Sequence, residues 1–125
     1  MTDHTVKSFG EQLETLSALV AQMGGLAEAQ FAAAIEAISR RDSAAAERAV
    51  GGDARIDEMQ VEIEERALKL LALRQPMAVD LRETLAAIKT AAELERIGDL
   101  AKNIAKRALV LNREPPIRLT QSLAR

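Results

Sequence analysis

Four carboxylate side chains stand in two pairs whose spacing could support metal chemistry. Asp57 follows Asp53 by four residues, and Asp99 follows Glu95 by the same interval. If both segments are helical, each pair lies on one face of its helix, because residues four apart are neighbours on successive turns. Like charges at this spacing destabilise an isolated helix by about 0.2–0.5 kcal/mol. A bound cation would offset that repulsion.

The absence of nearby histidine or cysteine indicates which metals such a site would take. Carboxylate oxygens are hard ligands that suit Mg, Ca, Mn or iron, whereas a structural zinc site usually needs Cys or His. The sequence therefore predicts a divalent or trivalent metal, with Mg, Mn or Fe as the cofactor, at Asp53, Asp57, Glu95 and Asp99. Asn103 lies one turn after Asp99 and could add a carbonyl oxygen.

The alternative is that these carboxylates are solvated or paired with basic residues on a helix surface. Lys102 lies three residues after Asp99, and Glu95 and Asp99 stand nearly opposite the apolar stripe of their helix, so any site there should be exposed. Other acidic residues fit ordinary surface pairs of opposite charge. These residues are Glu58, Glu62 with Arg66, and Glu65 with Lys69.

Few residues are available for catalysis. The chain has no cysteine, and its single histidine, His4, lies near an amino terminus that we expect to fray. We find no Glu-x-x-His motif of a di-iron protein, no glycine-rich phosphate loop and no nucleophile elbow. We therefore expect that the protein is not an enzyme. The main alternative to a metal-binding protein is a purely structural helical interaction module, and a metal-dependent hydrolase is a more distant one.

The composition favours an all-α protein with one domain. Hydrophobic residues make up 48% of the 125 residues but aromatic residues only 2%, so Ala, Leu, Ile, Val and Met must fill the core. The net charge is −2, and no aromatic residues alternate with basic ones, so we expect no nucleic-acid partner. The amino terminus lacks the layout of a secretory signal, and we find no stretch of about 18 apolar residues. A cytoplasmic protein is expected.

The apolar spacing predicts an antiparallel three-helix bundle of long helices. The helices are expected over residues 5–40, over residues 43–74, and from near Asp80 to Pro115-Pro116. Asp42 or Ser43 should cap the second helix, and Gly51-Gly52 should weaken or kink it. The expected apolar positions are Phe9, Leu13, Leu16, Val20, Met23, Ala27, Phe31, Ile35 and Ile38; then Ala49, Ile56, Ile63 and Leu70; then Leu81, Leu85, Ile88, Leu94, Ile97, Ala101, Ile104, Ala108 and Leu111.

A hairpin centred on Pro76 would bring the two carboxylate pairs to one level. Residues equally far from the turn lie at the same height in two antiparallel helices. Asp57 and Glu95 are each 19 residues from Pro76, and Asp53 and Asp99 are each 23 residues from it. We also expect Leu71 and Leu81 to bury the end of the bundle beside this turn.

Two segments resemble the first repeat of the PhoU family. They are LLALRQPMAVDLR at residues 70–82 and AAELERIGDLAKNIAKRAL at residues 91–109. The similarity extends more loosely through Asp53-x-x-Ile56-Asp57 and covers residues 5–112. It implies tandem three-helix bundles with surface metal clusters held by Asp/Glu-x-x-x-Asp motifs on paired helices. In this chain those motifs coincide with the two carboxylate pairs.

The resemblance also implies a function and partners. PhoU proteins are negative regulators that repress the phosphate-starvation response of the Pho regulon. They do so by linking the ATPase subunit of a phosphate ABC transporter to a sensor histidine kinase. This implies a signal-transduction protein that is peripheral to the inner face of the membrane through its partners, without inserting into it.

The resemblance also sets the expected domain organisation. The family has two repeats, whereas this chain stops soon after Pro115-Pro116. We therefore expect one bundle over residues 1–114, and over residues 115–125 a linker and the truncated start of a second repeat, with a helix beginning near residue 119. A homodimer is expected to cover the apolar surface that a missing second bundle would leave bare.

Overall fold

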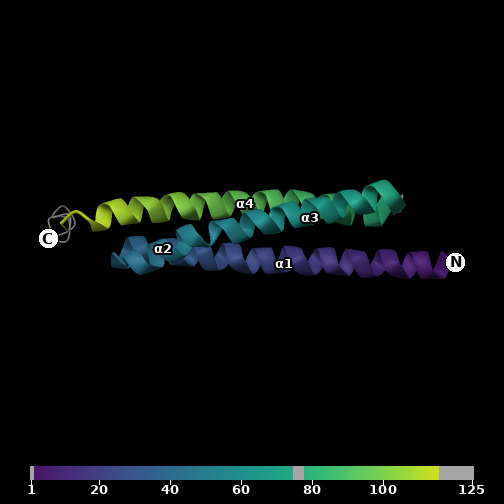
Figure 1. Cartoon of the computed structure of the whole chain (residues 1–125), viewed down its shortest axis with the longest axis horizontal. Helices are drawn as coiled ribbons and strands as arrows, with labels where there is room; N and C mark the ends of the chain where they lie inside the picture. The colour runs from purple at the N-terminus through teal and green to yellow at the C-terminus, as the bar shows by residue number, and fades with distance from the viewer. Residues whose placement is uncertain (1, 75–77, 116–125) are drawn as a thin grey trace.

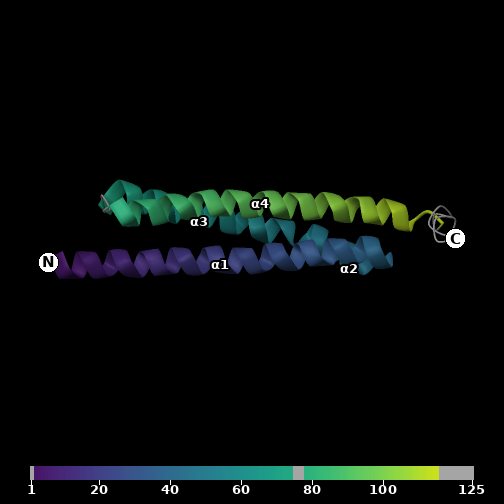
Figure 2. The same ribbon diagram turned by 180° about the vertical axis from the view of Figure 1, so that it is seen from behind.

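Three helical rods lie side by side in the computed structural model, which describes residues 2–74 and 78–115 (Figure 1). No strand occurs in that part of the chain, so the predicted all-α bundle is confirmed. The first and last rods run in the same direction, and the middle rod runs back between them (Figure 2). The helices are α1 (Thr2–Arg40), α2 (Ser43–Gly51), α3 (Asp53–Arg74) and α4 (Ala78–Asn112).

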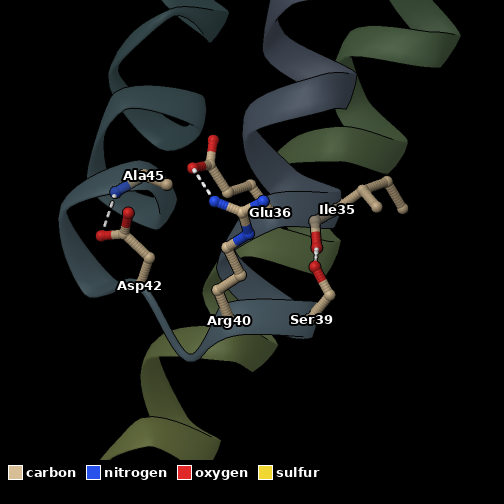
Figure 3. A network of polar contacts seen from close by, with 6 residues as sticks. All are labelled: Ile35, Glu36, Ser39, Arg40, Asp42 and Ala45. Atoms are coloured by element: carbon tan, nitrogen blue, oxygen red, sulfur yellow. Dashed lines mark hydrogen bonds and ion pairs between the residues drawn. The ribbon is translucent and has the colours of Figure 1, made fainter.

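A tight turn joins α1 to α2. Arg41 adopts a left-handed backbone conformation with φ of 54°, and the backbone N–H of Asp42 donates to the Ala37 carbonyl at 3.2 Å. This pattern is that of a Schellman motif, which ends a helix by reversing the chain. Asp42 then accepts a hydrogen bond from the backbone N–H of Ala45 at 3.1 Å and caps α2, as predicted (Figure 3).

The same turn holds the carboxyl end of α4. The Arg41 guanidinium donates to the carbonyls of Asn112, at 3.5 Å, and Glu114, at 2.6 Å. The Asn112 side-chain amide donates to the Ser43 hydroxyl at 3.1 Å. Backbone carbonyls at the end of a helix lack partners within it, so these contacts both satisfy them and fix α4 against the α1–α2 turn.

The expected kink at the glycine pair is a break between α2 and α3 at Gly52. The N–H of Gly52 still donates to the Arg48 carbonyl at 3.0 Å, but the next helix starts afresh at Asp53. Before the break, α2 lies along α1, and after the break, α3 crosses toward α4 (Figure 1). Asp53 is therefore at the amino-terminal end of a helix, where the helix dipole favours a negative charge.

The core has two parts of different composition. Large side chains dominate the part between α1, α3 and α4, whereas the fully buried residues of the part around α2 are all alanines. Alanine lets helix backbones approach closely, so the short α2 fits between α1 and α4. The expected positions Ala49, Ile56, Ile63 and Leu70 are all buried.

Part of the expected core is exposed instead. Phe31, Ile35 and Ile38 have 37%, 46% and 42% of their surface exposed, while Gln30, Ala34 and Ala37 are buried beside them. In α4 the exposed residues that we expected in the core are Leu81, Leu85, Ile97 and Leu111, and the buried ones include Thr84, Ala91, Gly98 and Ala105. From Phe31 onward the core face of α1 is displaced by one residue, because small side chains, not large ones, line these close helix contacts.

The end of the bundle near the hairpin is only partly as expected. Leu71 is half-buried, but Leu81 is exposed, so the prediction that both bury this end is wrong for Leu81. The chain reverses between Arg74 and Ala78, and Pro76 itself lies outside the described residues, as does the helix expected near residue 119. His4 lies within α1, which begins at Thr2.

One helix passes a length and composition test for a membrane span. Residues Ser8–Arg40 of α1 include a stretch with a mean hydropathy of 1.2, of which 22% is buried in the bundle. The expectation that no such stretch exists is therefore wrong for α1. Apolar core helices pass the same test. The consequence for this fold is that α1 presents many small and apolar residues on its outer side.

Candidate metal centre

Three of the four predicted ligands come together on α3 and α4. Asp53 is the first residue of α3, Asp57 lies one turn further, and Asp99 lies on α4. One carboxylate oxygen from each of these residues lies within 4.8 Å of the other two. The structure therefore brings these three side chains to one level, as the position of Pro76 predicted.

The negative charges of the same group act on Glu95, although Glu95 is not one of the three closest carboxylates. It is half-buried on α4, one turn before Asp99. Burial raises the pKa of its carboxyl, and so do a hydrogen bond with Asp99 and the negative charges of Asp99, Asp57 and Asp53. The pKa of Glu95 thus responds to the charges of the other three predicted residues.

Asp57 is subject to the same repulsion. Burial raises the pKa of its carboxyl, the charges of Asp53 and Asp99 raise it further, and the positive charge of Lys102 acts in the opposite direction. The ionised form of Asp57 is therefore held in an unfavourable environment.

Asp53 is the most buried member, with 5% of its surface exposed. Its Oδ2 accepts a hydrogen bond from Lys102 Nζ at 3.1 Å, while its buried Oδ1 has no hydrogen-bond partner among the described residues. Leaving a buried charged acceptor without a partner costs more than about 1–3 kcal/mol. An unpaired carboxylate oxygen beside two further carboxylates fits a hard cation, so these residues suit the predicted metal.

Lys102 is a member of this site that the sequence indicated only as a neighbour of Asp99. It reaches across from α4 to Asp53 on α3, and its pKa is raised by that hydrogen bond and by the charges of Asp53, Asp99 and Asp57. One ammonium group against four carboxylates leaves three negative charges uncompensated when all are ionised. Pairing with a basic residue on the helix surface, the alternative to a metal site, thus accounts for only one of these negative charges.

The ordinary surface pairs expected along α3 are absent from the described residues. Neither Glu62 with Arg66 nor Glu65 with Lys69 forms an ion pair, whereas Glu58 pairs with Arg55 at 3.3 Å. Exposed pairs of long side chains gain little and lose side-chain entropy, so their formation is not dictated by spacing. Asn103 is exposed on α4, and its role as a ligand stays a prediction.

Two shallow hollows on the surface lie apart from the carboxylates. One, of about 500 Å³, is on the outer side of α1, and the other, of about 350 Å³, lies between α1 and α4. The first is lined by Ala32, Ile35, Glu36, Ser39 and Arg40, and the second by Ser17, Val20, Glu83, Ala86, Ala87 and Thr90. Neither contains a carboxylate of the candidate metal centre.

Comparison with known proteins agrees with the resemblance to the PhoU family. A family model for the PhoU domain matches residues 20–108. The chain is 56% identical over its whole length to a phosphate-specific transport system accessory protein PhoU homolog of Caulobacter vibrioides, of which it covers 55%. A homolog of the same description from Xylella fastidiosa is 46% identical over 96% of this chain, which covers 50% of that protein.

The chain spans about half the length of these curated relatives. The family match covers most of the bundle, from the second third of α1 to the last turns of α4. It includes both carboxylate pairs of the candidate metal centre. This chain belongs to the PhoU domain family.

Proposed function

We propose that this chain is a metal-binding regulatory adaptor for phosphate transport. The observation that carries the metal part is the buried Oδ1 of Asp53, which has no hydrogen-bond partner within residues 2–74 and 78–115 and belongs to a carboxylate grouped with those of Asp57 and Asp99. Glu95 is the fourth proposed ligand, because its pKa responds to the charges of the other three. Mg, Mn or Fe would suit this all-oxygen set.

Membership of the PhoU family supports the regulatory part. Relatives are described as accessory proteins of a phosphate-specific transport system. We propose that this chain contacts the ATPase subunit of a phosphate ABC transporter and a sensor histidine kinase, and that it represses the phosphate-starvation response. It would then act in the cytoplasm, peripheral to the membrane through these partners.

The proposed action is binding and not turnover. Relatives are described as accessory proteins, and the residues gathered at the candidate metal centre are carboxylates and one lysine. A hydrolase would need turnover of phosphate esters that disappears together with these carboxylates. The adaptor proposal expects no such turnover in either the wild type or the variants.

A purely structural role has one observation in its favour, which is the Lys102–Asp53 ion pair across α3 and α4. In that case the carboxylates would only help to hold α3 against α4, through Lys102. The two roles differ in their response to metal. A structural cluster would leave the melting temperature unchanged when Mn²⁺ is added, whereas a metal site would raise it.

Thermal unfolding in EDTA and in Mn²⁺ tests the proposal. A cation that binds only the folded state adds about 2.7 kcal/mol at a hundredfold excess over Kd, so Mn²⁺ should raise the melting temperature of the wild type. The Asp57→Asn/Glu95→Gln variant should lose this response while its helicity stays intact. The variant Glu65→Gln/Glu93→Gln removes the same number of charges from exposed positions on α3 and α4, and it should respond like the wild type. Equal melting curves of the wild type with and without Mn²⁺ would refute the metal site.

A further inference from the structure

Gln30 is a buried polar side chain in an otherwise apolar part of α1. Only 5% of its surface is exposed, and its neighbours on the same helix face are Ala27, Ala34 and Ala37. Its side-chain amide donates to the Ala49 carbonyl at 2.6 Å, while its buried Oε1 finds no partner in the part of the chain that the structure describes. Glutamine is an unfavourable choice for such a position unless the hydrogen bond matters, because burying an unpaired polar atom costs about 1–3 kcal/mol.

The carbonyl that Gln30 contacts belongs to the break between α2 and α3. In a continuous helix the Asp53 N–H would donate to the Ala49 carbonyl, four residues earlier. The helix is interrupted at Gly52, so that bond is not formed, and the Gln30 side-chain amide donates to the Ala49 carbonyl. Gln30 therefore satisfies the hydrogen bond that the break leaves open.

Two glycines lie beside Gln30, of which Gly98 makes room for its side chain, and each immediately precedes a carboxylate of the candidate metal centre. A Cβ atom added at Gly98 would lie 3.0 Å from Gln30 Oε1, and one at Gly52 would lie 3.9 Å from Gln30 Cγ. Asp99 follows Gly98, and Asp53 follows Gly52. The Gln30 side chain thus fits between the two backbone segments that carry ligands from different helices.

We propose that Gln30 is a positioning residue for the metal centre, because it stabilises the α2–α3 break that places Asp53 at the start of α3. This inference rests on the proposed metal-binding function. Without the Gln30 donor, the Ala49 carbonyl loses its partner at the break, and accepting from the Asp53 N–H would restore one, so the helix becomes continuous through Gly52. Asp53 then stays one turn from Asp57 but shifts with the rejoined helix relative to Asp99 and Lys102 on α4.

The substitution Gln30→Met tests this role because methionine has a similar shape but no hydrogen-bonding group. Two quantities are measured in the full chain: the Kd for Mn²⁺ by calorimetry, and the hydrogen-exchange rate of the Asp53 amide by NMR in EDTA. We expect a Kd about 10-fold to 100-fold higher, as for other residues that orient metal ligands. We also expect slower exchange of the Asp53 amide, because it gains the Ala49 carbonyl as a partner.

The control Gln22→Met makes the same chemical change at an exposed position on α1, and it should alter neither quantity. If Gln30→Met fails to fold, Gln30→Ala removes the same donor within a face already lined by alanines. An unchanged Kd would overturn the role of Gln30 and leave the metal site standing. A higher Kd with unchanged Asp53 exchange would also overturn it, because the loss would then not act through the break. A wild type that binds no Mn²⁺ would overturn the proposed function itself, whatever the exchange data show.

Discussion

Asp57 and Glu95 give the candidate metal centre a definite dependence on pH. Burial and neighbouring negative charges raise the pKa of both carboxyls above their ordinary values of 3.8 and 4.5. The folded state therefore binds these protons more tightly than the unfolded chain does. The resulting stabilisation is fully present below the ordinary values and is lost as pH rises through the raised pKa values.

This predicts how the metal-free protein should respond to acid. The wild type in EDTA should lose stability, relative to the Asp57→Asn/Glu95→Gln variant, as the pH rises from about 4 toward 7. The comparison cancels titration of the other carboxylates, which both proteins share. Urea unfolding of the two proteins across this range measures the difference. A constant difference at all pH values would show that these two carboxyls are not under repulsion in the folded state.

Among single residues, the convergence of the carboxylates could be predicted from the sequence, whereas the contacts of Gln30 and Lys102 could not. The spacing of the four carboxylates about Pro76 was sufficient to predict that they converge. Lys102 reaches Asp53 only because α3 and α4 pack at one particular rotation, which spacing along one helix does not determine. Gln30 gave one signal, a single glutamine on an alanine-lined face, but its partner is a backbone carbonyl that no sequence pattern marks.

For the helices, local sequence was sufficient to predict where α2 begins and where it breaks. It was not sufficient to predict every side chain that faces the core. The Asp42 cap and the break at Gly52 were predictable because they depend on one or two residues. The faces of α1 and α4 were misplaced only in part, where the prediction followed large apolar residues such as Phe31 and Ile97. The expected positions that are buried are Phe9, Leu16, Met23, Ala27, Ala101 and Ala108. Close packing of helices around α2 requires alanine and glycine at the contact, so the larger residues are turned outward.

The α1–α2 turn offers a test of a single helix end. Arg41 has a left-handed backbone, which costs a non-glycine residue about 1 kcal/mol, and its guanidinium donates to two carbonyls near the end of α4. Arg41→Ala loses the hydrogen bonds and keeps the strain, whereas Arg41→Gly loses the hydrogen bonds and relieves the strain. We therefore predict that Arg41→Gly is more stable than Arg41→Ala by about 1 kcal/mol in urea unfolding. Equal stabilities, or the reverse order, would contradict a strained turn at Arg41.

At the scale of the whole molecule, the outer side of α1 is unusually apolar for a protein surface. Phe31, Ile35 and Ile38 are exposed there, and Ile97, Leu100 and Leu111 are exposed on α4. Exposed apolar patches of this kind often mark interaction surfaces. The chain also spans only about half the length of its relatives.

We predict that the isolated chain forms a homodimer through these residues of α1. The double variant Phe31→Glu/Ile35→Glu should shift the protein toward monomer in sedimentation equilibrium, because burying two unpaired carboxylates at an interface is unfavourable. Val61→Glu/Leu68→Glu makes the same change at exposed positions on α3 and should leave the association unchanged. A wild type that is monomeric at all concentrations tested, or an equal effect of both variants, would contradict an interface on α1.

Metal content measures most directly whether Asp53, Asp57, Glu95 and Asp99 bind a hard metal ion. The protein is dialysed against EDTA, then against a limiting concentration of Mn²⁺, and the bound metal is determined by elemental analysis. The wild type and the Glu65→Gln/Glu93→Gln control should retain Mn²⁺ in the same stoichiometric amount, and the variant Asp53→Asn/Asp57→Asn/Glu95→Gln/Asp99→Asn should retain none. Equal Mn²⁺ content in all three proteins, or none in the wild type, would contradict the account.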